Sequence, residues 1–410
     1  MDRGVPILVA SLAFVAGAAW LLGEQLEDTI FIPLDHPAIR YSGQPMNDPI
    51  ARLDKKLESG QVKLDFSPNG WGYLPSVLKQ LGVNIDSQML VFSRTSIQTE
   101  RISPRTPRAI YFNDEVAVGY VQRGEVLELT ALDPKQGVVM YSLDAVKTDQ
   151  PRFSRRDDCL RCHQGPVTLA VPGLLVSSVQ PRSDKREGHA GASMTDHRIP
   201  FDARWGGWYV TGTHGSQVHL GNNIALANPS QPGVRSLEGT QNVTSLAEML
   251  DTSKYLAPTS DLVALMTLEH QVRMTNLMTR IGWDARVAAQ EKKAAVPDWE
   301  IDELVKYMLF ADEAPLREPV KGVSTFTKTF AERGPRDHQG RSLRDFDLKT
   351  RLFRYRLSYM IYSAAFDNMP VSVRDRIYRR LYDGLAEDDR VAILAILRDT
   401  KQNLPAYFLK

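Results

Sequence analysis

Cysteine is almost absent from this chain, which has only two in 410 residues. A fold of this length is therefore not stapled by disulfides. An excess of charge is missing too: the formal net charge is +1, which gives no broad electrostatic reason to expect nucleic acid or another polyanion as a partner. No internal repeat or low-complexity tract is visible. With 43% hydrophobic residues, a chain of this length is expected to form two globular domains.

Both cysteines lie in one short string, Cys159-Leu160-Arg161-Cys162-His163. Residues three apart share one face of a helical turn, so the two thiols can reach both vinyl groups of one porphyrin and form thioethers. His163 follows directly, and its imidazole can ligate the iron from the proximal side. The spacing therefore predicts one covalently attached haem c.

Other interpretations of the string are weaker. A redox dithiol would open a helix after a strand in a βαβ unit, whereas the polar run 154–158 precedes this motif. A disulfide across two intervening residues is geometrically poor. No further cysteine can complete a zinc site, although a Cys2His2 site with a distant histidine stays open.

The N-terminus predicts export. Val5 to Leu22 is continuously apolar, with Arg3 before it and acidic residues after it. About 18 apolar residues can just span a bilayer, so residues 1–23 are expected to be a signal-anchor or a signal peptide. We expect an extracytoplasmic (periplasmic) body, tethered to the inner membrane by residues 5–22. Covalent haem attachment is expected on the same side of the membrane.

The pattern along the rest of the chain predicts an α+β fold. A linker (24–43) is followed by an α+β region (44–228) that carries the haem site, and a helical domain (259–410) ends the chain. Period-two alternation from Met89 to Val146 predicts an antiparallel β meander, with a further strand at 174–179. Helices are expected to start at Asn47-Asp48-Pro49 and near 74–81, then over 261–290, 299–310, 352–367, 371–385 and 388–399. In the longest of these, Ser260 is the expected cap and Glu269–Arg273 an i,i+4 pair.

The second axial position of the iron is less determined. A methionine there raises the reduction potential, a histidine lowers it, and an open position permits ligand binding. The candidates are Met194 and the histidines His189, His197, His214, His219 and His270. His270 stands in a helical stripe with three methionines, which is typical of flexible core packing and alternatively could face the haem.

A glycine-rich aromatic stretch, Arg204 to Gly215, is the most unusual part of the chain. It suits close backbone approach to a flat ligand, and a tight β-hairpin explains it equally well. Arg204 could hold a haem propionate through a bidentate contact or form a surface ion pair.

The segment around Cys159 to His163 resembles c-type cytochromes, which implies haem iron, two thioether links and a proximal histidine at these positions. The distal methionine motif of the small soluble cytochromes c is missing. The whole chain also resembles a group of exported bacterial single-haem proteins that pair a Cys-x-x-Cys-His site with an RWGGWYVTGTHG-type stretch (204–215 here). This resemblance implies no particular reaction.

The leading hypothesis is a membrane-tethered monohaem c-type cytochrome that exchanges single electrons with a redox partner protein or a quinol-linked chain. The chain is much longer than a minimal haem carrier, which leaves two alternatives. One is a peroxidase- or oxygenase-like haem enzyme with an open distal site, where His214, His219 or Arg204 would act. The other is a haem-based redox or gas sensor whose helical domain docks a partner.

Overall fold

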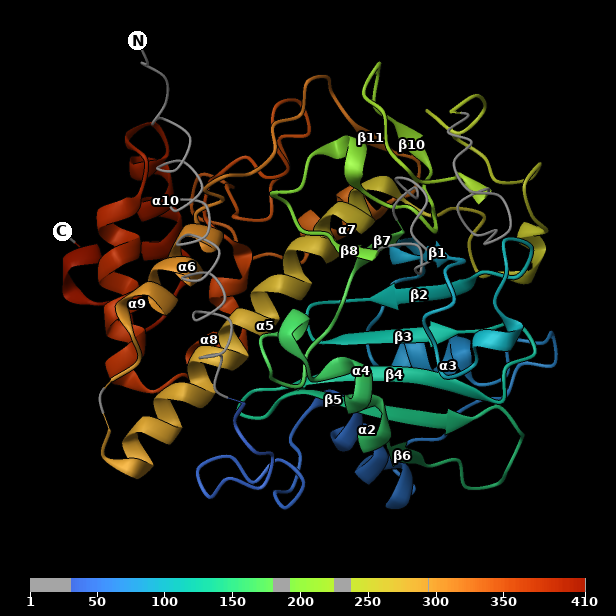
Figure 1. Ribbon diagram of the computed structural model, residues 1–410, viewed down its shortest axis with the longest axis horizontal. Coiled ribbons are helices and arrows are strands. Elements are labelled where there is room, and N and C mark those ends of the chain that lie inside the picture. Colours follow the sequence, from blue (N-terminus) through green and yellow to red (C-terminus); the bar gives the residue numbers. More distant parts are fainter. Residues whose placement is uncertain (1–30, 180–191, 225–236, 294, 410) are drawn as a thin grey trace, which may run out of the picture.

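A computed structural model describes residues 31–179, 192–224, 237–293 and 295–409 (Figure 1). An antiparallel sheet occupies the N-terminal part and helices dominate the C-terminal part, so the predicted α+β class is confirmed. No helix within these ranges is long and apolar enough to cross a membrane. The predicted anchor, residues 5–22, lies outside the described residues.

The centre of the N-terminal part is an antiparallel sheet of seven strands in the order β6-β5-β4-β3-β2-β1-β9. The predicted meander is confirmed, because β2 to β5 pair with their sequence neighbours. The strands are β1 (Met89–Val91), β2 (Arg108–Phe112), β3 (Val116–Tyr120), β4 (Val126–Asp133), β5 (Gly137–Asp144), β6 (Phe153–Arg155) and β9 (Trp208–Tyr209).

The two faces of the sheet have different coverings, as the period-two pattern requires. One face buries Leu127, Leu129 and Ala131 against the helices α2 (Pro49–Glu58) and α3 (Leu74–Gln80). Both helices were predicted, and the Asp48 carboxylate caps α2 by accepting hydrogen bonds from two backbone amides of its first turn. The opposite face lies toward α4 (Leu160–His163), which is in front of the sheet in Figure 1. Phe112 and Leu132 on this face share a hydrophobic core with α5 (Leu262–Glu291).

Helix α5 is the longest element, and it begins differently from the prediction. Asp261 is the cap, because its carboxylate accepts from the amides of Val263 and Ala264. The Ser260 hydroxyl instead bridges strands, donating to the Tyr209 carbonyl and accepting from the Leu90 amide. The predicted cap was therefore one residue too early, since the long-range partners of Ser260 are invisible in the sequence.

The predicted Glu269–Arg273 pair on α5 is also wrong. Glu269 is fully buried and pairs with Arg204 at 3.2 Å, whereas Arg273 pairs with Glu303 at 3.5 Å. An i,i+4 spacing allows contact only where both side chains share a solvent-facing stripe. Here each of the two side chains pairs with a residue from another part of the chain instead.

The C-terminal helices are α6 (Asp298–Met308), α7 (Phe326–Glu332), α8 (Ala364–Asp367), α9 (Val371–Gly384) and α10 (Glu387–Thr400). The helix predicted over 352–367 is wrong except at its end: a 3-10 turn covers Tyr359–Tyr362 and α8 follows it. Phe353, Tyr355 and Leu357 are buried while Arg354 is exposed, and this period-two burial is incompatible with a helix.

The C-terminal region is not purely helical either. Strand β11 (Lys321–Gly322) pairs with β10 (Gly212–Thr213) across a long sequence separation. A second two-stranded sheet joins β7 (Ser177–Val179), at the end of the predicted strand 174–179, to β8 (Ala192–Met194). One hydrophobic core contains Met89, Phe112 and Trp205 together with α5 and the later helices, so α5 packs against both parts of the chain.

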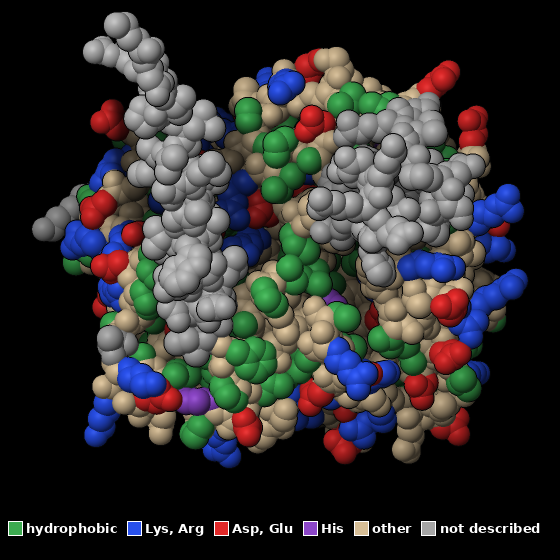
Figure 2. All heavy atoms as spheres, viewed as in Figure 1, with side chains coloured by type: hydrophobic (Ala, Val, Ile, Leu, Met, Phe, Trp, Pro, Cys, Tyr) green, Lys and Arg blue, Asp and Glu red, His purple; other side chains and the backbone are tan. Residues whose placement is uncertain are grey.

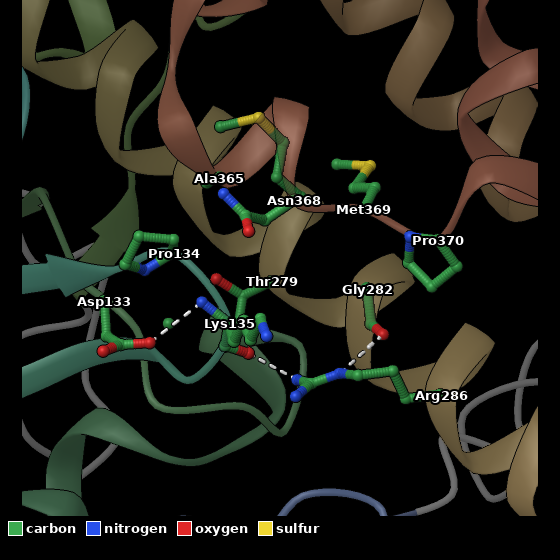
Figure 3. Close-up of a pocket in the computed structure, with 12 residues that line it drawn as sticks. Asp133, Pro134, Lys135, Thr279, Gly282, Arg286, Ala365, Asn368, Met369 and Pro370 are labelled. Atoms are coloured by element: carbon green, nitrogen blue, oxygen red, sulfur yellow. Dashed lines mark hydrogen bonds between the residues drawn. The ribbon is translucent and has the colours of Figure 1, made fainter. Parts of the chain in front are cut away.

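Figure 3 shows where the β4–β5 turn meets α5. The Arg286 guanidinium donates hydrogen bonds to the carbonyls of Lys135 and Gly282. The cavity between them is about 20 Å³, which is room for roughly one water molecule. Gly137 in the turn has φ +86°, and a β-carbon there would lie 2.4 Å from a Thr279 methyl group. This junction is therefore a packing contact rather than a ligand site.

Candidate functional site

The Cys-x-x-Cys-His motif directly follows β6, the edge strand of the sheet. Strand β6 leads into a 3-10 turn, Asp157–Cys159, and then into the single helical turn α4, Leu160–His163. The Arg156 amide donates to the Met140 carbonyl of β5 at 2.8 Å, which fixes the motif against the sheet. The helical turn predicted for the motif is thus present.

Neither cysteine is in a disulfide: Cys159 is half-buried and Cys162 is exposed. Burial raises the pKa of the Cys159 thiol, and the negative charge of Asp158 raises it further. A redox dithiol needs the opposite, a nucleophilic cysteine with a lowered pKa. The environment of the motif therefore disfavours the redox-dithiol interpretation.

The His163 ring is held in one orientation. Its Nδ1 lies 2.9 Å from the Gly173 carbonyl, and the Gly173 amide donates back to the His163 carbonyl at 2.9 Å. A carbonyl can only accept, so Nδ1 carries the proton and Nε2 keeps its lone pair. Nε2 has no hydrogen-bond partner within the described ranges. Burial lowers the pKa of His163, which favours the neutral imidazole that a metal requires.

Helix α5 holds the segment next to Gly173 through hydrogen bonds from Asn276. The Asn276 side chain accepts from the Leu174 amide at 3.0 Å and donates to the Leu174 carbonyl at 2.9 Å. Gly173 permits this approach, because a β-carbon there would lie 2.4 Å from Asn276 Oδ1. The chain that orients His163 is therefore anchored to the helical part of the fold.

A zinc site finds no support among the described residues. Within 31–179, 192–224, 237–293 and 295–409, no three His, Cys, Asp or Glu side chains are placed to hold a metal ion. Within these ranges, Cys159, Cys162 and His163 are therefore not placed to hold one metal ion together.

Two predicted distal histidines already have both ring nitrogens hydrogen-bonded. His214 Nδ1 lies 2.7 Å from the Gln217 carbonyl, and its Nε2 accepts from the Asn242 amide. His270 Nδ1 lies 2.9 Å from His197 Nδ1, and its Nε2 lies 2.8 Å from the Ser358 hydroxyl. Either ring would have to break a buried hydrogen bond to ligate iron.

The remaining distal candidates are placed as follows. His219 is buried against His214 at 4.7 Å between ring centroids, and its Nδ1 has no hydrogen-bond partner in the described chain. His197 Nε2 likewise lacks one there. Met194 is half-buried in β8, and His189 lies outside the described residues. The structure thus gathers four histidines into two pairs, and no ring contact links His163 to either pair in the described ranges.

Arg204 is a buried structural residue rather than a surface one. Its guanidinium donates to Glu269 and to the carbonyls of Ile199 and His197. Trp205 donates to the other oxygen of Glu269 at 2.9 Å. Burial raises the pKa of Glu269 to about 7, while Arg204 lowers it. All three nitrogens of Arg204 donate to protein groups and its side chain is only 4% exposed, so a propionate would have to reach a buried guanidinium.

The glycine-rich aromatic stretch is not a hairpin. Strand β9 pairs with β1, and β10 pairs with β11. A β-carbon at Gly206 would lie 1.9 Å from the Val179 carbonyl oxygen, so the glycine admits a neighbouring backbone. The close approach that the sequence suggested is therefore to protein in the described structure.

One charged pair near the motif was not anticipated. Arg108 of β2 donates to Glu128 of β4 at 2.9 Å on the sheet face that carries α4. Their charges act on His163 in opposite directions, Arg108 lowering its pKa and Glu128 raising it. Period-two alternation could have placed both side chains on one face of the sheet. It could not have placed them beside a motif that lies later in the chain.

Figure 2 shows the same side of the molecule, where hydrophobic side chains gather over α5 and the segment around α4. The surface beside the motif is thus partly apolar and partly charged.

No protein-family model, curated protein or solved structure matches this chain. The chemistry of the site therefore has to be inferred from its own residues.

Proposed function

We propose that the protein is an exported monohaem c-type cytochrome, with the haem joined to Cys159 and Cys162 and its iron ligated by His163 Nε2. The observation that carries this proposal is the hydrogen bond from His163 Nδ1 to the Gly173 carbonyl. Metal-binding histidines usually donate their second ring proton to a carbonyl or carboxylate, which fixes the tautomer and makes the ligating nitrogen more basic.

The accessibility of the thiols supports the same proposal. Cys162 is exposed and Cys159 is half-buried, so both can be alkylated by a porphyrin delivered from outside the fold. Bound haem would supply one-electron Fe(III)/Fe(II) chemistry. The protein itself would orient the His163 imidazole through the Gly173 carbonyl.

The cellular setting belongs to the proposal as well. An N-terminal apolar segment (5–22) would tether the body on the extracytoplasmic, periplasmic side of the membrane. A redox partner protein or a quinol-linked chain would exchange electrons there. The near-neutral net charge of +1 gives no support for nucleic acid as a partner.

A second candidate function has a specific observation in its favour. His214 and His270, two of the predicted distal ligands, have both ring nitrogens occupied by protein partners. This favours an iron whose sixth position is open, as in a haem enzyme of the peroxidase or oxygenase type or in a gas sensor.

The test is covalent haem staining together with absorption spectra of the purified protein. We expect stain on a denaturing gel for the wild type and none for C159A/C162A, because thioethers survive denaturation. H163A should retain the stain but lose the proximal ligand. A wild-type protein matured in an export-competent host that carries no stain would overturn the haem proposal.

Spectra with carbon monoxide separate the two functions. A six-coordinate electron carrier should not change on adding carbon monoxide to the reduced protein. Ready formation of a carbon monoxide complex would exclude that form and support the open-site alternative.

A further inference from the structure

The sheet face in front of α4 carries an ion pair that crosses a strand. Arg108 lies on β2 and Glu128 on β4, with Gly119 of β3 between them. A β-carbon at Gly119 would lie 3.5 Å from Glu128 Cβ and 3.6 Å from Arg108 Cδ. Gly119 is buried, and the absence of a side chain there lets the Arg108 and Glu128 side chains meet across β3.

Glu128 is fully supplied with donors. Its Oε1 accepts from the Ser96 hydroxyl and from the side-chain Nε2 of Gln98, the latter at 2.9 Å. Its Oε2 accepts from Arg108 Nη1. With both oxygens engaged, Glu128 holds the Arg108 guanidinium in place and takes no part in binding a further cation.

Arg108 has donor capacity left over. Its Nε is buried and has no hydrogen-bond partner within the described ranges, although the side chain as a whole keeps 17% of its exposure. A buried donor without an acceptor destabilises the folded protein. The guanidinium is a planar fork that matches a carboxylate. The missing partner is therefore expected to be an anion.

Other arginines in the described chain also have an unpaired Nε, namely Arg273, Arg344 and Arg351. Arg108 differs from these because it lies on β2, on the sheet face opposite to α2 and α3, where Glu128 of β4 holds it. Helix α4 lies in front of the same sheet face (Figure 1). An anion bound at Arg108 would thus adjoin whatever is attached to the motif.

We propose that Arg108 binds a propionate carboxylate of the haem, with Glu128 positioning the guanidinium. This rests on the proposed function, since the carboxylate belongs to the group attached at Cys159 and Cys162. Arg108 then takes the role that the sequence suggested for Arg204, whose donors are used inside the core.

Arg108 and Glu128 are expected to shift the reduction potential of the iron in opposite directions. A cation beside the cofactor disfavours the oxidised form, which carries one more positive charge, and an anion favours it. Removing the charge of Arg108 should lower the reduction potential, and removing that of Glu128 should raise it. Opposite shifts from two contacting residues are not expected from a general loosening of the fold.

The experiment measures haem stain and reduction potential on the full chain for R108Q, R108K and E128Q. Arg152 gives the matched control: it also pairs with a carboxylate, Asp54 of α2, on the other side of the sheet. We expect stain in all variants, a lower potential in R108Q, partial recovery in R108K, a higher potential in E128Q and no shift in R152Q.

The experiment distinguishes failure of the Arg108 proposal from failure of the haem proposal. Loss of stain in the wild type would refute the haem itself. Normal stain with an R108Q potential equal to that of R152Q would refute the role of Arg108 alone. If R108Q does not fold, R108K and E128Q still test the role of Arg108. Reduction potentials of these two variants equal to that of the wild type would overturn the inference.

Discussion

The imidazoles of His197 and His270 share a hydrogen bond inside the protein, Nδ1 to Nδ1 at 2.9 Å. Only one of two facing nitrogens can carry a proton, so the two rings cannot both be cations. Burial lowers the pKa of His270 to about 3 and holds that of His197 well below its usual range. Tyr307 stacks on His197 with ring centroids 4.1 Å apart. At this scale the pair is a neutral, aromatic part of the core.

We expect H270Q to cost about 2–4 kcal/mol of unfolding free energy at pH 7, because it breaks buried hydrogen bonds to His197 and Ser358. An unfolded histidine titrates near 6.5 and the folded His270 near 3, so the unfolded state binds more protons between these values. The contribution of His270 is complete above pH 6.5 and declines as the pH falls toward 3. The difference between wild type and H270Q should therefore shrink from pH 7 to pH 4.5.

Denaturant titrations at pH 7, 6 and 4.5 check this expectation. H338Q is the matched control, since the His338 side chain is 69% exposed and its replacement should change stability by less than about 0.5 kcal/mol. A stability difference for H270Q that stays constant over this pH range would show that His270 is not buried in its neutral form.

At the scale of elements, the sheet and α5 meet through the β4–β5 turn. Gly137 adopts φ +86°, and the absence of its side chain lets Thr279 of α5 approach. The turn pattern Asp133-Pro134-Lys135-Gln136-Gly137 is local, and by itself it favours a loop. Its contact with α5 joins residues far apart in the chain, which no local pattern encodes.

Substitution of Gly137 by alanine should destabilise the protein by about 2–4 kcal/mol, because it adds the cost of positive φ to a clash with Thr279. Gly60 offers a control with φ +70° and no atom within 4 Å of a β-carbon. G60A should cost only about 1 kcal/mol. Chemical denaturation measures both, and equal losses for the two variants would mean that the turn does not pack on α5.

At the scale of the whole molecule, one core connects the two parts of the chain. Sheet residues such as Phe112 and Leu132 share a hydrophobic cluster with α5 and the C-terminal helices. Asn276 of α5 also secures Leu174, next to the residue that orients His163. The haem site proposed above therefore depends on the helical region for its geometry.

We expect residues 31–258 alone not to fold cooperatively, because removal of α5 exposes the apolar sheet face that it covers. Amide NMR dispersion and the sharpness of urea unfolding are the measurements, with residues 31–410 as the control. A dispersed spectrum and a single sharp transition for 31–258 would establish an independent domain, as the sequence predicted.

Local patterns in the sequence determined the helical turn at Cys159–His163, the meander from β2 to β5, and the capped helix α2, because each depends on neighbours a few residues away. Tertiary structure alone decided the rest. The Ser260 hydroxyl bridges two strands instead of capping α5, and Arg204 is buried with Glu269. Residues 353–357 alternate in burial instead of forming a helix. The orientation of His163 and the charges beside it also come from Gly173, Asn276, Arg108 and Glu128, which only the folded chain brings together.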